Sequence, residues 1–411
     1  MSIVKNKIKN LENVAGRIKK AVYDNGRIII YGDSDMDGIA SSVILQEAIK
    51  NLGGGVGMVL FPNREEDGYG INFRAIEYVR DKAPAFAKGF GPLRHSSSEA
   101  SEARPALFIT LDLGITNIKE VDALNALGFS VIIIDHHQIL NGLPAAEIII
   151  DPKQEGDDSN STHLANVGIT FLLAQELLGG QMSMQLKNSF LELTALATIS
   201  DMVPQIEENK MFIEEGLRSL KNTFRPGLRA FLDILGEGTV LSDGLYKVIS
   251  ALNAAESIDF KNESYQLLTT ASATEARDLA EKLIGKTNYK QQKIKEAVDE
   301  VERRISQNPD ASIIFEGDPA WKLTLAGPIA SIIAQKYQKP TFIFKKGDSE
   351  SCGSVRSLVE GEDSVQAMKT CADILVTYGG HAKASGFRIK NGNLERFKKA
   401  LSEHFKNINS R

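Results

Sequence analysis

The sequence feature that most constrains the fold is a set of carboxylates that directly follows a short apolar stretch. Ile28–Ile30 are apolar, and Asp33, Asp35 and Asp37 follow within one short segment. Carboxylates this close repel one another by roughly 1 kcal/mol per pair at 4 Å in water, and more strongly in a cleft. A folded protein keeps them together when cations lie between them. Gly38 allows a sharp turn, and helical apolar spacing follows it. The segment therefore predicts a strand, a metal-binding loop and a helix.

Three other interpretations of this segment are possible. DSDMDG matches the start of a calcium-binding EF-hand loop, but that loop follows a helix and needs a bidentate Glu at its twelfth position, where this chain has Ile44. The Asp-x-Asp-Gly loop of dehalogenase-type phosphatases, read from Asp35, leaves the motifs described next unexplained. Three solvated aspartates without a ligand are the remaining interpretation.

Further apolar stretches end in the same residue types. ALFITLD over residues 106–112 ends in an aspartate, FSVIIIDHH over 129–137 ends in Asp-His-His, and Asp201 follows a helix predicted over 183–199. Strands that alternate with helices predict a parallel sheet, whose carboxyl ends meet at one edge. Five carboxylates and a histidine at this edge predict a two-metal site that suits Mn²⁺, with Mg²⁺ as a weaker substitute. The predicted ligands are Asp33, Asp35, Asp37, Asp112, His136 and Asp201.

Length and charge bear on the domains and on the partner. A chain of 411 residues exceeds one ordinary core, and we predict a catalytic domain over 1–235, a helical connector over 236–308 and a substrate-binding domain over 309–411. From Trp321 onward the chain has 15 Lys and Arg against 8 Asp and Glu, although its net charge is −5. A basic C-terminal domain suits an anionic polymer. A merely solvated basic surface is the alternative.

Other features of the sequence exclude several classes of protein. No apolar run approaches the roughly 18 residues of a membrane span, and the N-terminal segment lacks the apolar core of a secretion signal. We therefore expect a cytoplasmic protein that does not bind a membrane. Cys352 and Cys371 are the only cysteines, which argues against a disulfide framework or a thiolate zinc site. Residues 83–104 are rich in Ala, Ser, Gly and Glu and predict a mobile surface insertion.

Several motifs together resemble a known family. DSDMDG, TLDLG, IDHH and TISDMVP resemble the four ordered motifs of the DHH phosphoesterases. NREEDGYG resembles a loop of the RecJ-type single-strand exonucleases, and residues 273–294 resemble the helix between their two domains. CGSVRS and YGGHAKASGF resemble the signature of the DHH-associated domain. The resemblance implies an α/β fold in which a long helix joins a parallel-sheet DHH domain to a smaller α/β C-terminal domain.

The resemblance also implies roles for individual residues. Asp112 would bridge two metal ions, His137 would face the scissile phosphate, and Asp135 would orient a ring nitrogen. One ion would be held by Asp33, Asp35 and Asp112, and the other by Asp37, Asp112, His136 and Asp201. The implied substrate-binding residues are Arg64, Tyr69, Ser354, Arg356, a turn at Gly379 and Gly380, and His381. The implied reaction is in-line hydrolysis of a phosphodiester bond.

The chain departs from the RecJ-type pattern in three places. Ala251 and the pair Glu256 and Ser257 replace arginines and a glycine, and Lys322 replaces a histidine. No oligonucleotide-binding barrel follows the C-terminal motif, so we expect a core-only enzyme.

Three functions are compatible with these motifs. The first is a Mn²⁺-dependent exonuclease on single-stranded DNA or RNA, expected to be DNA degraded 5′ to 3′, with replication or repair proteins as partners. The second is a phosphodiesterase for short oligonucleotides or cyclic dinucleotides, which the missing arginines favour. The third is a non-catalytic replication scaffold, which the complete set of ligand positions disfavours.

Overall fold

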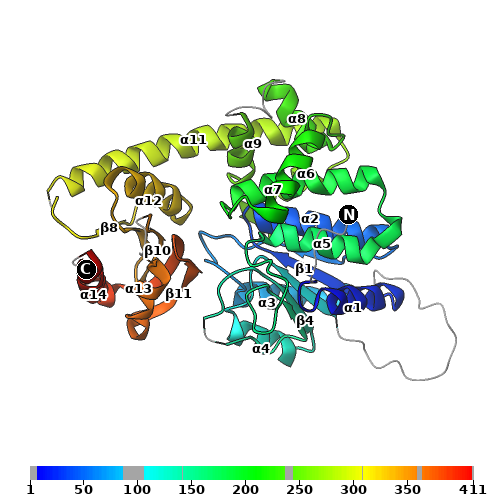
Figure 1. Cartoon of the computed structure of the whole chain (residues 1–411), viewed down its shortest axis with the longest axis horizontal. Coiled ribbons are helices and arrows are strands. Elements are labelled where there is room, and N and C mark those ends of the chain that lie inside the picture. The colour runs from blue at the N-terminus through cyan, green and yellow to red at the C-terminus, as the bar shows by residue number, and fades with distance from the viewer. Residues whose placement is uncertain are drawn as a thin grey trace. The chain divides into compact units, whose positions relative to one another are not determined.

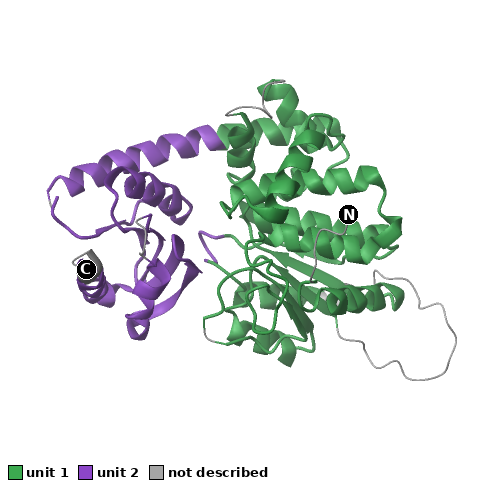
Figure 2. Ribbon diagram, in the orientation of Figure 1, with its two compact units in different colours: residues 1–63, 69–286 green, residues 64–68, 287–411 purple. Residues whose placement is uncertain are grey.

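The computed structural model describes residues 7–86, 106–140, 142–236, 244–307, 309–358 and 363–409. They form two compact units, coloured separately in Figure 2: residues 1–63 with 69–286, and residues 64–68 with 287–411. Helix α11 (Ala273–Ile305), with 33 residues, runs from the first unit into the second and is the predicted long connecting helix.

The first unit is built on a five-stranded parallel sheet in the order β2-β1-β3-β4-β5. Nearly continuous Ile, Leu and Val in these strands are typical of parallel strands that are buried on both faces. The strands are β1 (Ile28–Gly32), β2 (Met58–Leu60), β3 (Leu107–Leu111), β4 (Ser130–Ile134) and β5 (Ile148–Ile150).

Helices cover both faces of this sheet (Figure 1). Ile28 and Ile30 pack with α1, α2 and α5, whereas Ile29 and Tyr31 pack with α3 and α4, because successive side chains of a strand point to opposite faces. The helices are α1 (Leu11–Tyr23), α2 (Met36–Asn51), α3 (Phe73–Phe86), α4 (Ile118–Ala126), α5 (Asn166–Leu178), α6 (Met184–Ser200), α7 (Glu207–Leu220), α8 (Pro226–Leu235), α9 (Gly244–Leu252) and α10 (Glu263–Thr269), with a short hairpin of β6 (Ser257–Ile258) and β7 (Lys261–Asn262).

The second unit contains a mixed five-stranded sheet in the order β11-β12-β10-β9-β8, in which only β8 and β9 pair in parallel. Phe342 and Phe387 pack on one face against α14, and Ile343 packs on the other against α12 and α11. The elements are β8 (Ile314–Asp318), α12 (Leu323–Tyr337), β9 (Thr341–Lys346), β10 (Glu350–Arg356), α13 (Ser364–Lys369), β11 (Leu375–His381), β12 (Ala384–Lys390) and α14 (Leu394–Asn409).

The predicted α/β fold with a parallel-sheet domain, a long helix and a smaller α/β C-terminal domain is confirmed. The predicted domain boundaries stay a prediction. The predicted insertion begins too early, because residues 83–86 form the end of α3, and residues 87–104 lie outside the described residues. Among the helices that the structure describes, none is long and apolar enough to cross a membrane.

Candidate metal centre

Three neighbouring strands of the first unit are each followed by an aspartate that extends the sheet by one hydrogen bond. The backbone amides of Asp33, Asp112 and Asp135 donate to the last carbonyls of β3, β4 and β5, each at 3.0 Å. All three side chains are buried. The carboxyl ends of the strands therefore bring these aspartates to one edge of the sheet, as the alternating pattern predicts.

The end of the loop after β1 and the first turn of α2 orient two further carboxylates. The Oδ1 atom of Asp35 caps α2 by accepting from the amides of Asp37 and Gly38, each at 3.1 Å. Gly38 lies in the first turn of α2 rather than in a turn before it, and a Cβ there would lie 2.4 Å from the Asp33 carbonyl oxygen. The carboxylate of Asp37 accepts from the first two amides of α5, each at 2.8 Å. The positive end of a helix stabilises a negative charge at this place.

The imidazole of His136 faces three carboxylates. Its Nδ1 lies 3.0 Å from the Leu164 carbonyl. Because a carbonyl only accepts, Nδ1 carries a proton, and in the neutral imidazole Nε2 carries the lone pair. His136 Nε2 lies 3.2 Å from Asp112 Oδ1. It also lies 3.6 Å from Asp201 Oδ2 and 3.8 Å from Asp37 Oδ2. A proton or a shared metal ion must lie between such acceptors, and a divalent cation would satisfy all of them together.

Electrostatics and backbone geometry both indicate that this cluster is costly without a cation. Burial raises the pKa of Asp112 well above its usual range, and repulsion from Asp37 raises it further. Burial likewise raises the pKa of the Asp37 carboxyl, with Asp201 as the next cause. Asp112 has a φ of 64°, a left-handed conformation that few residues other than glycine adopt. Strain of this kind is concentrated at functional sites.

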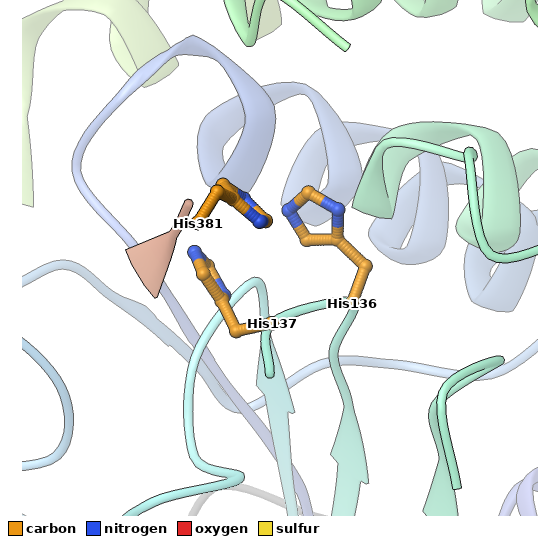
Figure 3. Close-up of side chains that lie close together, drawn as sticks. All are labelled: His136, His137 and His381. Atoms are coloured by element: carbon orange, nitrogen blue, oxygen red, sulfur yellow. The ribbon is translucent and has the colours of Figure 1, made fainter. Parts of the chain in front are cut away.

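Asp135 orients the second histidine, His137, rather than the first. Its Oδ1 accepts from His137 Nδ1 at 2.7 Å, and its Oδ2 accepts from the Ile115 amide at 3.0 Å. Burial alone would lower the pKa of His137, but Asp135 outweighs it and raises that pKa to about 9. Figure 3 shows the rings of His136 and His137 side by side at the end of β4, with their centroids 4.7 Å apart. Figure 3 also labels His381, which belongs to the second unit.

The ligand atoms fall into two neighbouring sets that could hold metal ions. One set is Asp33, Asp35 and Asp112, and another is Asp37, His136 and Asp201, with the atoms of each set within 4.8 Å of one another. Asp112 Oδ1 of the first set lies 3.2 Å from His136 Nε2 of the second set, so Asp112 connects the two sets, and its bridging role stays a prediction. Carboxylate oxygens with one imidazole fit Mn²⁺ or Mg²⁺. The structure thus brings all six predicted ligands together at one sheet edge.

Sequence reasoning missed Asn253, which holds two parts of this cluster together. Its Oδ1 accepts from the amide of Met36 in α2 at 3.0 Å, and its Nδ2 donates to Ser200 Oγ in α6 at 2.7 Å. Asn253 therefore ties the start of α2, where Asp35 and Asp37 lie, to the helix end that carries Asp201. The only signal in the sequence was that Asn253 lies in SALNAAESI, residues 250–258, the segment in which this chain departs from the RecJ-type pattern.

Two charged residues after β5 were also missed. The Lys153 ammonium donates to the His136 carbonyl, and burial lowers the pKa of Lys153. Asp151 directly follows β5, and burial together with repulsion from Asp135 raises its pKa to about 7. The segment AEIIIDP repeats the pattern of an apolar strand followed by an aspartate, so Asp151 could have been found from the sequence.

Most of the predicted substrate-binding residues belong to the second unit. Arg64, Ser354, Arg356 and His381 lie there, whereas Tyr69 lies in the first unit and is 51% exposed. Ser354 is buried in β10. The guanidinium of Arg356, at the end of β10, donates through Nε to Ser331 Oγ of α12 at 3.0 Å and through one terminal nitrogen to the carbonyl of its preceding residue at 2.8 Å.

The prediction of a turn at Gly379 and Gly380 is wrong. Both glycines lie within β11 and pair with Gly386 and Ser385 of β12. Gly380 has a φ of 121°, and a Cβ there would lie 2.7 Å from the Ala384 carbonyl oxygen. Glycine is therefore needed for close strand pairing, and the hairpin turn begins only after β11 ends.

Two family models match the chain. The model described as "DHH family, N-terminal domain" matches residues 27–198, and the model described as "DHHA1 domain" matches residues 310–407. The matched ranges contain the parallel sheet of the first unit and the mixed sheet of the second. Residues 27–198 are therefore a DHH-family domain, and residues 310–407 are a DHHA1 domain.

Known proteins similar to this chain are RecJ exonucleases. The chain is 30% identical over 405 residues to "Single-stranded-DNA-specific exonuclease RecJ" of Bacillus subtilis (strain 168), an alignment that covers 96% of this chain and 48% of the relative. The RecJ of Dickeya dadantii (strain 3937) is 29% identical over 412 residues, which cover 94% of this chain and 67% of the relative. This chain thus spans about half the length of the Bacillus relative.

A solved structure shows the same similarity. The structure described as "Crystal structure of exonuclease RecJ bound to manganese" matches with a TM-score of 0.73 and 26% identity, and the match covers 97% of this chain and 95% of that one. The fold of both units is therefore shared with a manganese-bound RecJ.

Proposed function

We propose that this chain is a RecJ-like exonuclease that hydrolyses phosphodiester bonds of single-stranded DNA and needs two divalent ions, Mn²⁺ in preference to Mg²⁺. The observation that carries the proposal is the approach of His136 Nε2 to Asp112 Oδ1 at 3.2 Å, with two further carboxylates around the same nitrogen. The similar RecJ proteins act on single-stranded DNA, and one RecJ structure contains manganese. Degradation 5′ to 3′ is part of the proposal.

The cluster supplies ligands for both ions. We assign Asp33, Asp35 and Asp112 to one ion, and Asp37, Asp112, His136 and Asp201 to the other. The clustering of Asp33, Asp35 and Asp112, the clustering of Asp37, His136 and Asp201, and the 3.2 Å approach of Asp112 to His136 support this assignment. When bound, such ions lower the pKa of water and offset the charge of an attacked phosphate.

The remaining residues act on the substrate in this proposal. Asp135 fixes the ring of His137 through Nδ1, so the opposite ring nitrogen can donate a hydrogen bond to a phosphate oxygen. Arg356 offers a planar fork to phosphate, with its Nε already held by Ser331. Exposed Tyr69 offers a ring on which a base can stack. Protein partners in replication or repair remain a prediction from the resemblance.

A second candidate function is hydrolysis of short oligonucleotides or cyclic dinucleotides. Two positions at which RecJ-type enzymes carry arginines or a glycine favour this function. Here one of them is Ala251, which is fully buried, and the other is Glu256, which pairs with Lys286 at 3.0 Å. Neither residue offers a cation to the end of a strand, so the grip on a long substrate would depend on the second unit.

The test compares substrates and metals on the full chain. The protein is first freed of metal by chelation, and Mn²⁺, Mg²⁺, Zn²⁺ or Ca²⁺ is then added back. Each sample is given either a single strand of about 30 nucleotides, labelled at either end, or a dinucleotide. The proposal predicts fastest degradation of the strand with Mn²⁺, with the label positions giving the polarity. Cleavage of dinucleotides alone would support the second candidate, and no hydrolysis with any ion would overturn both.

Asp112→Asn is the inactive reference for this assay, because asparagine tolerates the left-handed backbone that the position requires. We expect it to fall below about one per cent of wild-type activity. The matched control is Asp122→Asn, which changes an exposed aspartate of α4 in the same unit. This control should keep full activity.

A further inference from the structure

A short acidic segment connects the two units a second time. Residues Arg64–Gly68 belong to the second unit, although the chain on both sides of them belongs to the first, and Figure 2 draws them in the colour of the second unit. The chain therefore passes between the units once through α11 and twice at this segment. We call Arg64–Gly68 the acidic loop, because it contains Glu65, Glu66 and Asp67.

Glu65 anchors the acidic loop within the second unit. Its Oε1 accepts from the backbone amide of Thr324 at 2.8 Å and from the Thr324 hydroxyl at 3.0 Å. Its Oε2 accepts from Lys345 Nζ at 3.2 Å. Both oxygens of one largely buried carboxylate are therefore bound to donors of the same unit.

These contacts cap helix α12. The residue at its own N-cap, Lys322, makes no capping hydrogen bond with its side chain, and the first amides of a helix have no partner within the helix. Glu65 fills this place from a distant part of the chain, at the positive end of the helix dipole. Although burial opposes ionisation, the amides of Thr324 and Leu323 and the ammonium of Lys345 lower the pKa of Glu65.

Helix α12 in turn holds Arg356. Arg356 Nε donates to Ser331 Oγ in the middle of α12 at 3.0 Å. The helix packs closely on β10, because a Cβ on Gly327 would lie 3.3 Å from a terminal nitrogen of Arg356 and 3.6 Å from Ser354 Oγ. The start of α12, where Glu65 binds, and the guanidinium of Arg356 are thus parts of one packed arrangement.

The other end of the acidic loop also lies against a basic residue. A Cβ on Gly68 would lie 2.2 Å from a terminal nitrogen of Arg388, so this guanidinium lies directly on the loop. Cys352 of β10 lies opposite Lys345 of β9 on one side and opposite Arg388 of β12 on the other, in the backbone register of the sheet. The acidic loop therefore meets two cations of one row across the sheet, which fits its charge.

We propose that Glu65 is a positioning residue: by capping α12 from the acidic loop, it fixes the helix against which Arg356 is held for the phosphates of a long substrate. This inference rests on the proposed function. It predicts that loss of Glu65 weakens binding of a long strand and leaves the metal-dependent chemistry intact.

The first measurement is amide hydrogen exchange of the full chain, which does not depend on activity. In Glu65→Ala, the first turn of α12 should exchange about tenfold faster than in the wild type. Glu65→Gln should give a smaller change, because it keeps an oxygen for the Thr324 amide. The matched control is Glu395→Ala, which removes an exposed acidic residue from the first turn of α14 in the same unit and should change nothing.

The second measurement separates KM from kcat in the Mn²⁺ assay. Glu65→Ala should raise KM for the single strand of about 30 nucleotides by about 3- to 10-fold and leave kcat and dinucleotide hydrolysis unchanged. Lys345→Met, which leaves the loop sequence intact, should shift KM in the same direction. The double variant Glu65→Ala with Arg356→Ala should have nearly the same KM as Arg356→Ala alone, because both substitutions act through the guanidinium of Arg356.

The outcomes distinguish this inference from the proposed function. Unchanged exchange in α12 would overturn the capping role, and faster exchange with an unchanged KM would overturn the positioning role. A wild type that hydrolyses no nucleotide substrate would overturn the proposed function and the positioning role with it, whereas the exchange result would still report on the cap.

Discussion

Two carboxylates, fully buried Asp112 in the first unit and partly buried Glu65 in the second, show how differently a folded chain can treat the same chemical group. Asp112 in the first unit lies beside an imidazole lone pair and other carboxylates, and its pKa is raised. Glu65 in the second unit is bound to a helix amide, a hydroxyl and an ammonium, and its pKa is lowered. A carboxylate among donors stabilises the fold, whereas a carboxylate among acceptors stabilises it only when a cation is bound.

The largest expected effect is on catalysis in the first unit. Asp37→Ala removes a predicted ligand and should reduce hydrolysis by about a thousandfold, since one ion would lose its place. Rates on the single strand at saturating Mn²⁺ measure this effect, with Asp122→Ala as the exposed control. Retention of more than a few per cent of the wild-type rate would contradict the two-ion assignment.

The next effect distinguishes the two kinds of carboxylate through stability. Mn²⁺ at about 100 times its dissociation constant should stabilise the wild type by about 2.7 kcal/mol, seen as a rise in Tm. Asp112→Asn should raise the Tm of the metal-free protein, because it removes a repelled charge, and should lose most of the response to Mn²⁺. A lower Tm of metal-free Asp112→Asn, or a full rise of its Tm with Mn²⁺, would contradict the proposed contrast between the two carboxylates.

A smaller effect is expected at the guanidinium that α12 holds. A charge-assisted contact between Arg356 and a phosphate contributes about 1.5–3 kcal/mol. Arg356→Ala should therefore lower kcat/KM on single strands by about 10- to 150-fold and leave Mn²⁺ binding unchanged. Steady-state kinetics and a Mn²⁺ titration of the Tm measure the two quantities. An unchanged kcat/KM on every nucleotide substrate would rule out a substrate role for this residue.

The last effect is a difference between the two units in the pH dependence of stability. In the metal-free protein the pKa of Asp112 is raised above its ordinary value of 3.8. The contribution of this shift to the free energy of unfolding is therefore greatest below pH 3.8 and is lost as the pH rises through the raised pKa. The pKa of Glu65 is lowered below its ordinary value of 4.5. The contribution of this shift to the free energy of unfolding is therefore complete above pH 4.5 and is lost as the pH falls through the lowered pKa. Acidification should therefore stabilise the first unit and then weaken the second.

Hydrogen exchange followed in each unit separately measures these opposite slopes. Asp112→Asn should flatten the response of the first unit, and Glu65→Gln that of the second. If both units responded in parallel to pH, the contrast between the two carboxylates would be lost.

Local sequence determined much of the first unit. Ile28–Ile30, ALFITLD and FSVIIIDHH are apolar runs that end in ligand types, and parallel strands necessarily collect their carboxyl ends at one edge. For this reason the α/β fold could be predicted, and all six predicted ligands meet in the structure. The same logic would have included Asp151 if the run AEIIIDP had been read in the same way.

Local sequence could not determine contacts whose partners lie far away in the chain. Gly379 and Gly380 look locally like a turn, but strand pairing with β12 decides their conformation. Asn253 was only one amide in a loop until the fold placed it between α2 and α6. The cap of α12 joins Glu65 to Thr324, which lies 259 residues away. Such contacts depend on where the chain returns in space, and that is decided by the packing of whole elements rather than by the pattern within any one of them.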